Sequence, residues 1–106
     1  MRLPASFDGV APMPRHWVRV RRLDAIEDGT IVPVVVRGTH LILIRENHRI
    51  YATERACPHE GADLSTGRCL HGNLFCPRHF AWFGLEDGQV HGGWHFRRLR
   101  TYRTYV

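Results

Sequence analysis

The sequence of 106 residues contains no lysine, so all fifteen of its basic residues are arginine. Cysteine is also scarce, and three thiols cannot form a fully paired set, which excludes a disulfide scaffold. No apolar run, including in residues 1–15, is long enough for a signal-peptide core or a membrane span. These absences, with the short length, predict a cytoplasmic protein of one domain, residues 1–106.

Two short boxes each combine one cysteine with one histidine: Cys57-Pro58-His59 and Cys76-Pro77-Arg78-His79. Each box brings a thiolate and an imidazole into one tight loop. Two such loops can hold two irons asymmetrically, with the cysteines on one iron and the histidines on the other. Pro58 and Pro77 fix φ directly after each cysteine and lack an N–H, which stiffens the turn. The pattern therefore predicts a Rieske-type [2Fe–2S] centre.

Two cysteines and two histidines are also a common tetrahedral zinc set, because zinc and iron both accept thiolate and imidazole. Zinc modules usually place two cysteines in one half of the site and two histidines in the other. Here each half carries one of each ligand. The mixed halves favour the iron–sulfur centre, and a structural zinc-binding interaction module is the alternative.

With these boxes the chain resembles the small Rieske ferredoxins that supply electrons to bacterial ring-hydroxylating oxygenases. The resemblance covers nearly the whole chain. It runs from Trp17–Val20, through residues 57–64 and 76–79, to the closing segment 99–106. The two boxes are its specific part, and the flanking segments carry much less information.

The resemblance implies one Rieske [2Fe–2S] cluster per chain. The implied ligands are Cys57 and Cys76 on the buried iron, and His59 and His79 on the iron nearer the surface. It also implies that Gly61 allows the sharp first loop and that Leu64 covers the cluster. The second ring nitrogen of each histidine, if exposed, gives the cluster a protonatable edge at which a partner would dock.

High-potential Rieske proteins carry features that this chain lacks. An extra cysteine in each of their boxes forms a disulfide, and Ala62 and Arg78 occupy those positions here. Their serine and tyrosine hydroxyls, which donate to the sulfur ligands, are replaced by Ala81 and Phe83. Such hydrogen bonds stabilise the more negative reduced cluster, so we expect a potential of about −150 mV rather than +300 mV.

Two positions depart from the resembled ferredoxins. Phe80 follows the second box where they usually have glycine, and the loop Gly92–His95 lacks the proline that they tend to have. Phe80 and Trp82 are interpreted either as core or as an apolar lid over the cluster, and Phe83 as core. A third loop around the cluster is expected at Gly92–His95.

Alternating and β-branched segments separated by turn residues predict an all-β protein. Strands are expected at Trp17–Arg21, Ile31–Val36, Leu41–Ile44, Ile50–Thr53 and Tyr102–Val106. Turns are expected at Arg37–His40, Arg45–Arg49, Ser65–Gly67, His71–Asn73 and Glu86–Gly88, and at most one helical turn in Asp24–Gly29. The simplest architecture is a Rieske-like antiparallel β-sandwich or barrel with a small inserted cluster-binding subdomain at about residues 51–83.

The net charge of +5 comes from arginines that gather near both ends of the chain. They are Arg19, Arg21 and Arg22 near the front and Arg97, Arg98, Arg100 and Arg103 in the last ten residues. Guanidinium groups bind carboxylates well, and clustered charge speeds encounter with an oppositely charged surface, so an acidic redox partner is one interpretation. A solvated charged face is the other. Nucleic acid is disfavoured because no binding motif accompanies the charge.

The remaining histidines and cysteine have simpler interpretations. His71, His91 and His95 lie near the boxes but have no cysteine or acid at ligand spacing, which favours surface or loop positions, with His95 able to line a docking face. His16, His40 and His48 are expected to be solvated. Cys69 is expected to be a small buried or half-buried residue rather than a reactive thiol.

The function implied by the resemblance is one-electron transfer from a flavin-dependent reductase to a terminal oxygenase, with no substrate chemistry of its own. A full oxygenase subunit is disfavoured, because its catalysis needs a second iron on a facial triad of two histidines and a carboxylate, and a domain for the substrate. The alternative, also by resemblance, is the small Rieske subunit of a larger redox enzyme such as a nitrite reductase.

Overall fold

The computed structural model describes residues 2–4, 17–19, 26–78 and 81–105. The predicted ligand His79, its neighbour Phe80, and Arg21 and Arg22 of the arginine cluster are among the positions that lie outside the described residues. The strands are β1 (Arg2–Pro4), β2 (Trp17–Arg19), β3 (Ile31–Val36), β4 (Thr39–Glu46), β5 (Arg49–Glu54), β6 (Arg68–Leu70), β7 (Asn73–Phe75), β8 (Trp82–Gly84), β9 (Val90–His91) and β10 (Thr101–Tyr102). One 3₁₀ turn, η2 (Leu64–Thr66), precedes β6. In the described residues no helix is long and apolar enough to cross a bilayer.

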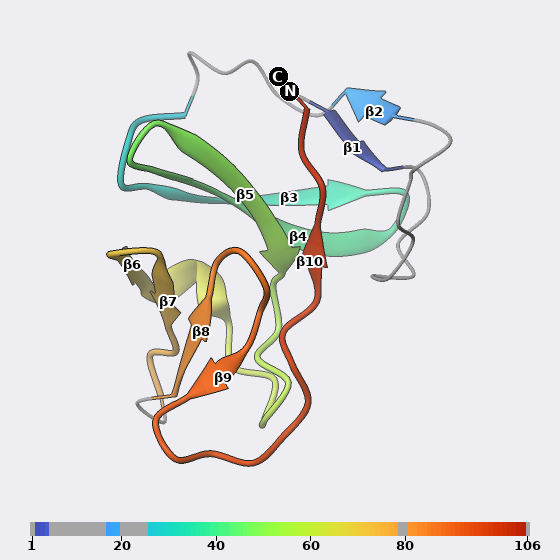
Figure 1. Ribbon diagram of the computed structural model, residues 1–106. Helices are drawn as coiled ribbons and strands as arrows, with labels where there is room; N and C mark the ends of the chain where they lie inside the picture. Colours follow the sequence, from blue (N-terminus) through green and yellow to red (C-terminus); the bar gives the residue numbers. More distant parts are fainter. Residues whose placement is uncertain (1, 5–16, 20–25, 79–80, 106) are drawn as a thin grey trace.

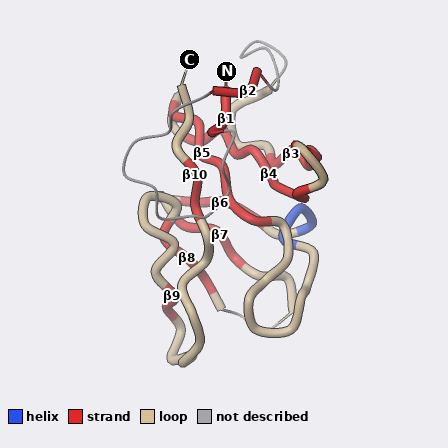
Figure 2. The backbone as a smooth tube through the Cα atoms, turned by 90° about the vertical axis from the view of Figure 1, so that its right-hand side faces the viewer, coloured by secondary structure: helices blue, strands red, loops and turns tan. Residues whose placement is uncertain are grey.

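Most strands of the described chain belong to two four-stranded antiparallel sheets (Figure 1). The first has the order β10-β5-β4-β3, and the second has the order β6-β7-β8-β9. β1 and β2 pair separately. Much of the chain around the second sheet consists of long loops, which are drawn in tan in Figure 2. The predicted all-β antiparallel fold class is confirmed.

Tight two-residue turns join the strands β3, β4 and β5 of the first sheet, and also β6 and β7 of the second. Arg37 and Gly38 connect β3 to β4 with φ of 51° and 80°. Positive φ at both positions is the type I′ geometry, whose twist matches the flanking strands. The turn predicted at Arg37–His40 is therefore shorter than expected, because Thr39 already pairs with Val36. Asn47-His48 and His71-Gly72 form equivalent turns.

The predicted strand Ile31–Val36 is observed with the same bounds, whereas the closing strand is shorter than expected. The strand β10 ends at Tyr102, so the prediction is wrong for the next two residues. There the hydroxyl of Thr104 donates to the carbonyl of Ile50 at 3.0 Å, a side-chain bond in place of a ladder bond. Val106 lies outside the described residues, as do the last two residues of the predicted strand Trp17–Arg21.

The strand β4 is buried on both faces, which explains its uninterrupted apolar run. Residues 41–44 are all fully shielded from solvent. Ile42 and Ile44 face a core that also contains Cys57 and Cys76. The alternate residues of β4 face a second core with Ile26, Val34, Val36 and Ala52. Successive strand residues point to opposite faces, so a strand between two cores must be apolar at every position.

Candidate metal centre

The first loop begins directly after the end of β5 and closes on itself. The N–H of Cys57 donates to the carbonyl of Ala62 at 2.8 Å, and the N–H of Gly61 donates back to the carbonyl of Cys57 at 2.8 Å. Gly61 has a φ of 75°, which L residues with a side chain rarely adopt. The predicted role of Gly61 in a sharp loop is confirmed.

The second loop repeats this closure. The N–H of Cys76 donates to the carbonyl of Ala81 at 2.8 Å, again five positions further along the chain. Both loops therefore share the pattern Cys-Pro-x-x-x-Ala, in residues 57–62 and 76–81. Sequence reasoning had treated both alanines only as missing functional groups. The repeated pattern was the available signal that their carbonyls close the two loops.

The closures bring the two cysteine side chains together inside the first core. Cys57 and Cys76 are 2% and 5% exposed, and both are free thiols. Burial raises the pKa of Cys57 above its ordinary value, and a hydrogen bond with Cys76 raises it further. The backbone amides of His59 and Glu60 point at the Cys57 sulfur and oppose that rise in pKa. The two cysteine side chains thus share one buried position, with amides already directed at the Cys57 sulfur.

His59 lies in the first loop, two residues after Cys57, and its ring packs against the segment that follows β9. Its ring is 4.7 Å from that of Trp94 and 5.1 Å from that of Phe96, measured between centroids. Its Nδ1 atom is buried. Trp94 and Phe96 pack against the same core as the cysteines. Residues 92–96 are thus the third loop at the site, although the proline expected there is absent.

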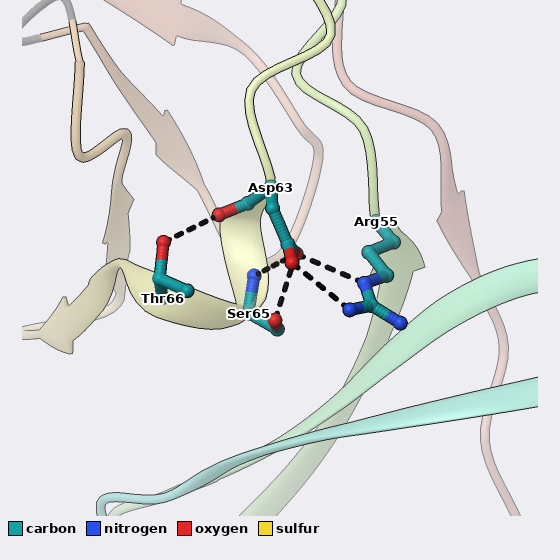
Figure 3. Close-up of polar contacts among 4 residues, drawn as sticks. All are labelled: Arg55, Asp63, Ser65 and Thr66. Carbon is teal, nitrogen blue, oxygen red and sulfur yellow. Dashed lines mark hydrogen bonds and ion pairs between the residues drawn. The ribbon is translucent and has the colours of Figure 1, made fainter.

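Asp63 organises the end of the first loop (Figure 3). Its carboxylate accepts two hydrogen bonds from Arg55, each 2.9 Å long, and two from Ser65. The hydroxyl of Thr66 donates to the Asp63 carbonyl at 2.8 Å. Arg55 first, and then Ser65, hold the pKa of the Asp63 carboxyl far below its usual range. Asp63 thereby caps η2, whose first residue, Leu64, is fully buried against the cysteines.

Glu54 holds the segment that directly follows the third loop, as Asp63 holds the end of the first. It binds both terminal nitrogens of Arg97, at 2.6 and 2.8 Å, and accepts the N–H of Arg100 at 2.9 Å. The Glu54 side chain is only 13% exposed, so the pair is shielded on the carboxylate side. The sequence leaves Arg97 as part of either a docking patch or a solvated charged face, and it does not point to Glu54. The structure pairs Arg97 with Glu54 of the same chain, at the surface.

The residues without a predicted ligand role lie where the sequence indicated. His40, His48, His71, His91 and His95 are exposed, and His16 lies outside the described residues. Cys69 is half-buried, and its thiol donates to the carbonyl of Gly29 at 3.6 Å. Burial, and then the nearby Glu46 and Asp28, raise the pKa of Cys69, which lowers its reactivity at neutral pH.

Of the four predicted ligands, Cys57 and Cys76 meet in the first core, and His59 lies in the same loop as Cys57 with its ring against the third loop. His79 lies outside the described residues, and within the described ranges no three His, Cys, Asp or Glu side chains form a group that could hold a metal ion. The donor set of two buried thiols and an imidazole with a buried Nδ1 fits a mixed thiolate and imidazole cluster.

Comparison with known proteins decides the family. The family model of the Rieske [2Fe-2S] domain matches residues 16–103. The chain belongs to the Rieske [2Fe–2S] family. The ferredoxin component of the naphthalene 1,2-dioxygenase and salicylate 5-hydroxylase systems of Ralstonia sp is 32% identical over 74% of this chain and 75% of that protein. The chain is accordingly a Rieske ferredoxin, an electron-transfer protein that carries a [2Fe–2S] cluster rather than a zinc ion.

Two solved structures share the Rieske fold. The ferredoxin of carbazole 1,9a-dioxygenase from Nocardioides aromaticivorans has a TM-score of 0.78 and 26% identity, over 84% of this chain and 88% of that one. A complex of reduced oxygenase and oxidised ferredoxin in carbazole 1,9a-dioxygenase contains a chain with a TM-score of 0.66 and 30% identity, over 72% of this chain and 79% of that one.

The positions that distinguish high-potential Rieske proteins are now placed in the fold. Ala81 and Phe83 are both fully buried in the core that contains the two cysteines, and neither side chain can donate a hydrogen bond. Phe83 is core, as predicted. Trp82 points to the other side of β8, half-buried, and stacks on Phe75 and His91, so it is not part of that core.

We predict that Asp63→Ala destabilises the cluster-loaded protein by about 1 kcal/mol in denaturant unfolding, because it removes the cap of η2. Asp63→Asn keeps a side chain that can cap η2 but removes the negative charge, so this variant measures the contribution of the charge alone. Because the folded state lowers the pKa of Asp63, its charge stabilises the fold fully above the unfolded-state pKa of about 3.9. This stabilisation is lost progressively as the pH falls from there through the lower folded-state pKa.

The difference between wild type and Asp63→Asn should therefore be largest at neutral pH and shrink in acid. Glu86→Gln is the control, since the Glu86–Arg49 pair is exposed, and such pairs contribute little. A difference between wild type and Asp63→Asn that grows as the pH falls would contradict the assigned role.

We predict that Ala81→Ser raises the midpoint potential of the cluster. The new hydroxyl would lie next to Cys76 in the core, where a hydrogen bond to sulfur stabilises the reduced state. The measurement is a redox titration followed by visible absorption. Ala52→Ser is the matched control, because Ala52 is equally buried but lies in the second core. An unchanged potential in Ala81→Ser would contradict the expectation.

Proposed function

We propose that this Rieske ferredoxin transfers single electrons from a flavin-dependent reductase to a terminal oxygenase of a bacterial ring-hydroxylating system. The observation that carries the proposal is the pair of buried thiols from two matching loops, one of which also carries His59, in a chain whose curated relative is a ferredoxin component. A bound [2Fe–2S] cluster takes up and releases one electron.

The ligand set of the proposal is Cys57 and Cys76 on one iron and His59 and His79 on the other. Burial of both thiols supports the inner position, where sulfur ligands are shielded from water. The buried Nδ1 is the nitrogen of His59 that we assign to iron. Without hydroxyl donors at Ala81 and Phe83, the cluster has a potential at the low end of the Rieske range, about −150 mV.

The terminal oxygenase is proposed as the electron acceptor because a related ferredoxin forms a complex with its oxygenase in carbazole 1,9a-dioxygenase. A carrier of this kind also needs a donor, for which a flavin-dependent reductase is suited. The curated ferredoxin relative supports this role over that of a nitrite reductase small subunit.

An acidic surface on the partner is proposed from the arginines that follow the third loop. Arg98, Arg100 and Arg103 are exposed on the segment that leads into and out of β10. Arg97 is excluded from this set because Glu54 binds it. Exposed guanidinium groups attract carboxylates and speed encounter at low salt. No membrane or nucleic-acid partner is proposed.

The chain is further proposed to work in the cytoplasm, where a free Cys69 and an assembled cluster are compatible with the reducing conditions. We also propose one domain, residues 1–106, with the cluster-binding subdomain at about residues 51–83. The second sheet itself continues to His91, and the third loop contributes ring contacts to His59 from beyond that range.

We predict that His59→Ala and His79→Ala each abolish the mixed-ligand paramagnetic resonance signal of the reduced protein, because the outer iron would lose an imidazole. Iron and acid-labile sulfide should both be about two per wild-type chain, the content of one [2Fe–2S] cluster. His71→Ala is the control, since His71 is exposed on a turn. One zinc ion and no sulfide in the purified protein would refute the proposed ligand set.

We predict that electron transfer to the oxygenase slows as salt rises, because salt screens attraction between exposed charges. Replacing Arg98 and Arg100 together by glutamine should slow it by roughly two- to tenfold at low salt and flatten the salt dependence. Arg68→Gln removes an equally exposed charge from β6 and serves as the control. A rate independent of salt in the wild type would remove the basis for an acidic docking surface.

A further inference from the structure

We propose that Phe96 and Trp94 are positioning residues that hold the imidazole of His59 in the orientation in which it binds iron. This inference rests on the proposed assignment of His59 as a ligand. It assigns a role to the loop after β9. That loop contains no proline, and its one histidine, His95, has no cysteine or acid nearby at the spacing of a metal ligand.

The three rings form one contiguous group. The rings of Phe96 and His59 are nearly parallel, with an interplanar angle of 9° and centroids 5.1 Å apart. Trp94 contacts His59 at a tilt of 48°, with centroids 4.7 Å apart, and contacts Phe96 at 6.3 Å. His59 is therefore stacked on one ring and limited by a second ring at an angle to it.

This arrangement restricts the rotation that matters for a ligand. The χ2 angle of histidine is a broad, roughly two-fold torsion, so the side chain by itself does not select one ring plane. A parallel stack against Phe96 selects the plane, and Trp94 obstructs rotation away from it. The more usual device for orienting a metal-binding histidine is a hydrogen bond to its second ring nitrogen. The two rings of the third loop restrict the orientation of the imidazole by packing.

Phe96 and the residues that follow it are fixed by contacts with the core and with β5. Phe96 contacts the fully buried Phe83 at 5.9 Å between centroids, which ties it to the core that contains both cysteines. The next residue, Arg97, forms the two-nitrogen contact with Glu54. Further along, the N–H of Leu99 donates to the carbonyl of Gly88 at 2.8 Å, and its side chain is buried.

The exposure pattern separates the two positioning residues from their neighbour. Trp94 and Phe96 are half-buried, whereas His95 between them is exposed. Alternation with a period of two places the first and third side chains on the same side of an extended segment. His95 therefore offers a control at the same loop, in which a side chain is removed without loss of a ring from the stack.

The test compares cluster-loaded variants. Phe96→Ala should lose its cluster on the order of tenfold faster than wild type during aerobic incubation, as loss of a group that orients a ligand typically weakens metal binding by that amount. Its reduced protein should also show shifted and broadened g values. Trp94→Ala should change both readouts in the same direction. Phe96→Tyr, which keeps the ring, should restore both to wild-type behaviour.

Three variants protect the test against general loss of stability. Phe96→Leu keeps an apolar side chain in the core but removes the ring plane, so the folded variant should still show altered g values. Trp82→Ala removes a half-buried tryptophan that stacks on Phe75 and His91, and His95→Ala truncates the exposed neighbour. Both should retain the wild-type signal and rate of cluster loss.

Wild-type g values and cluster retention in Phe96→Leu would overturn the positioning role while leaving the ligand set intact. Equal changes in Trp82→Ala and Trp94→Ala would also overturn it, since any lost aromatic contact would then have the same effect. Failure of the ligand set is recognised separately: His59→Ala would then keep the mixed-ligand signal.

Discussion

The structure depends on the meeting of two cysteine thiols at one buried position. Each thiol is carried by a loop whose cysteine N–H closes on an alanine carbonyl, Ala62 in one loop and Ala81 in the other. In the absence of metal, burial favours the neutral thiol, as the raised pKa of Cys57 reflects. Metal binding requires thiolate, so the cluster and the folded loops stabilise one another through the same contacts.

The first sheet anchors the first loop and the end of the third loop through the last residue of β5 and the residue after it. Glu54 binds Arg97, which directly follows the third loop, and Arg55 binds Asp63, which directly follows the first-loop closure at Ala62. Neighbouring residues of an extended chain point in opposite directions, so one dipeptide can reach two separate loops. Glu54 and Arg55 precede Cys57 by three and two residues. The sheet therefore sets the geometry of the site without contributing a ligand.

The aromatic residues divide between two faces of the second sheet. Phe83 points into the core with the cysteines and contacts Phe96, which stacks on His59. Trp82, one residue earlier, joins Phe75 and His91 in a ladder of stacked rings across β7, β8 and β9. Because successive strand residues point to opposite faces, Phe83 packs on the side of the predicted ligand His59, and Trp82 packs on the outer face of the sheet.

Local signals in the sequence determined much of this protein. The spacing of cysteine and histidine in the two boxes indicated the cluster, because ligands within one loop are local by construction. The β-branched run at Ile31–Val36 predicted its strand with the observed bounds, since strand propensity and alternation are also local. Turn residues predicted the hairpins, although the first turn proved shorter, because strand pairing extended to Thr39.

Only the tertiary structure decided which distant side chains meet at the site. Glu54 and Arg97 lie 43 positions apart in the chain, and no periodic pattern links them. The stacking of Phe96 on His59 likewise joins two loops that the sequence describes separately. Such contacts depend on how the sheets bring loops together, which is a property of the whole packed chain. The sequence therefore identified the chemistry of the site, and the fold determined the groups that hold it in place.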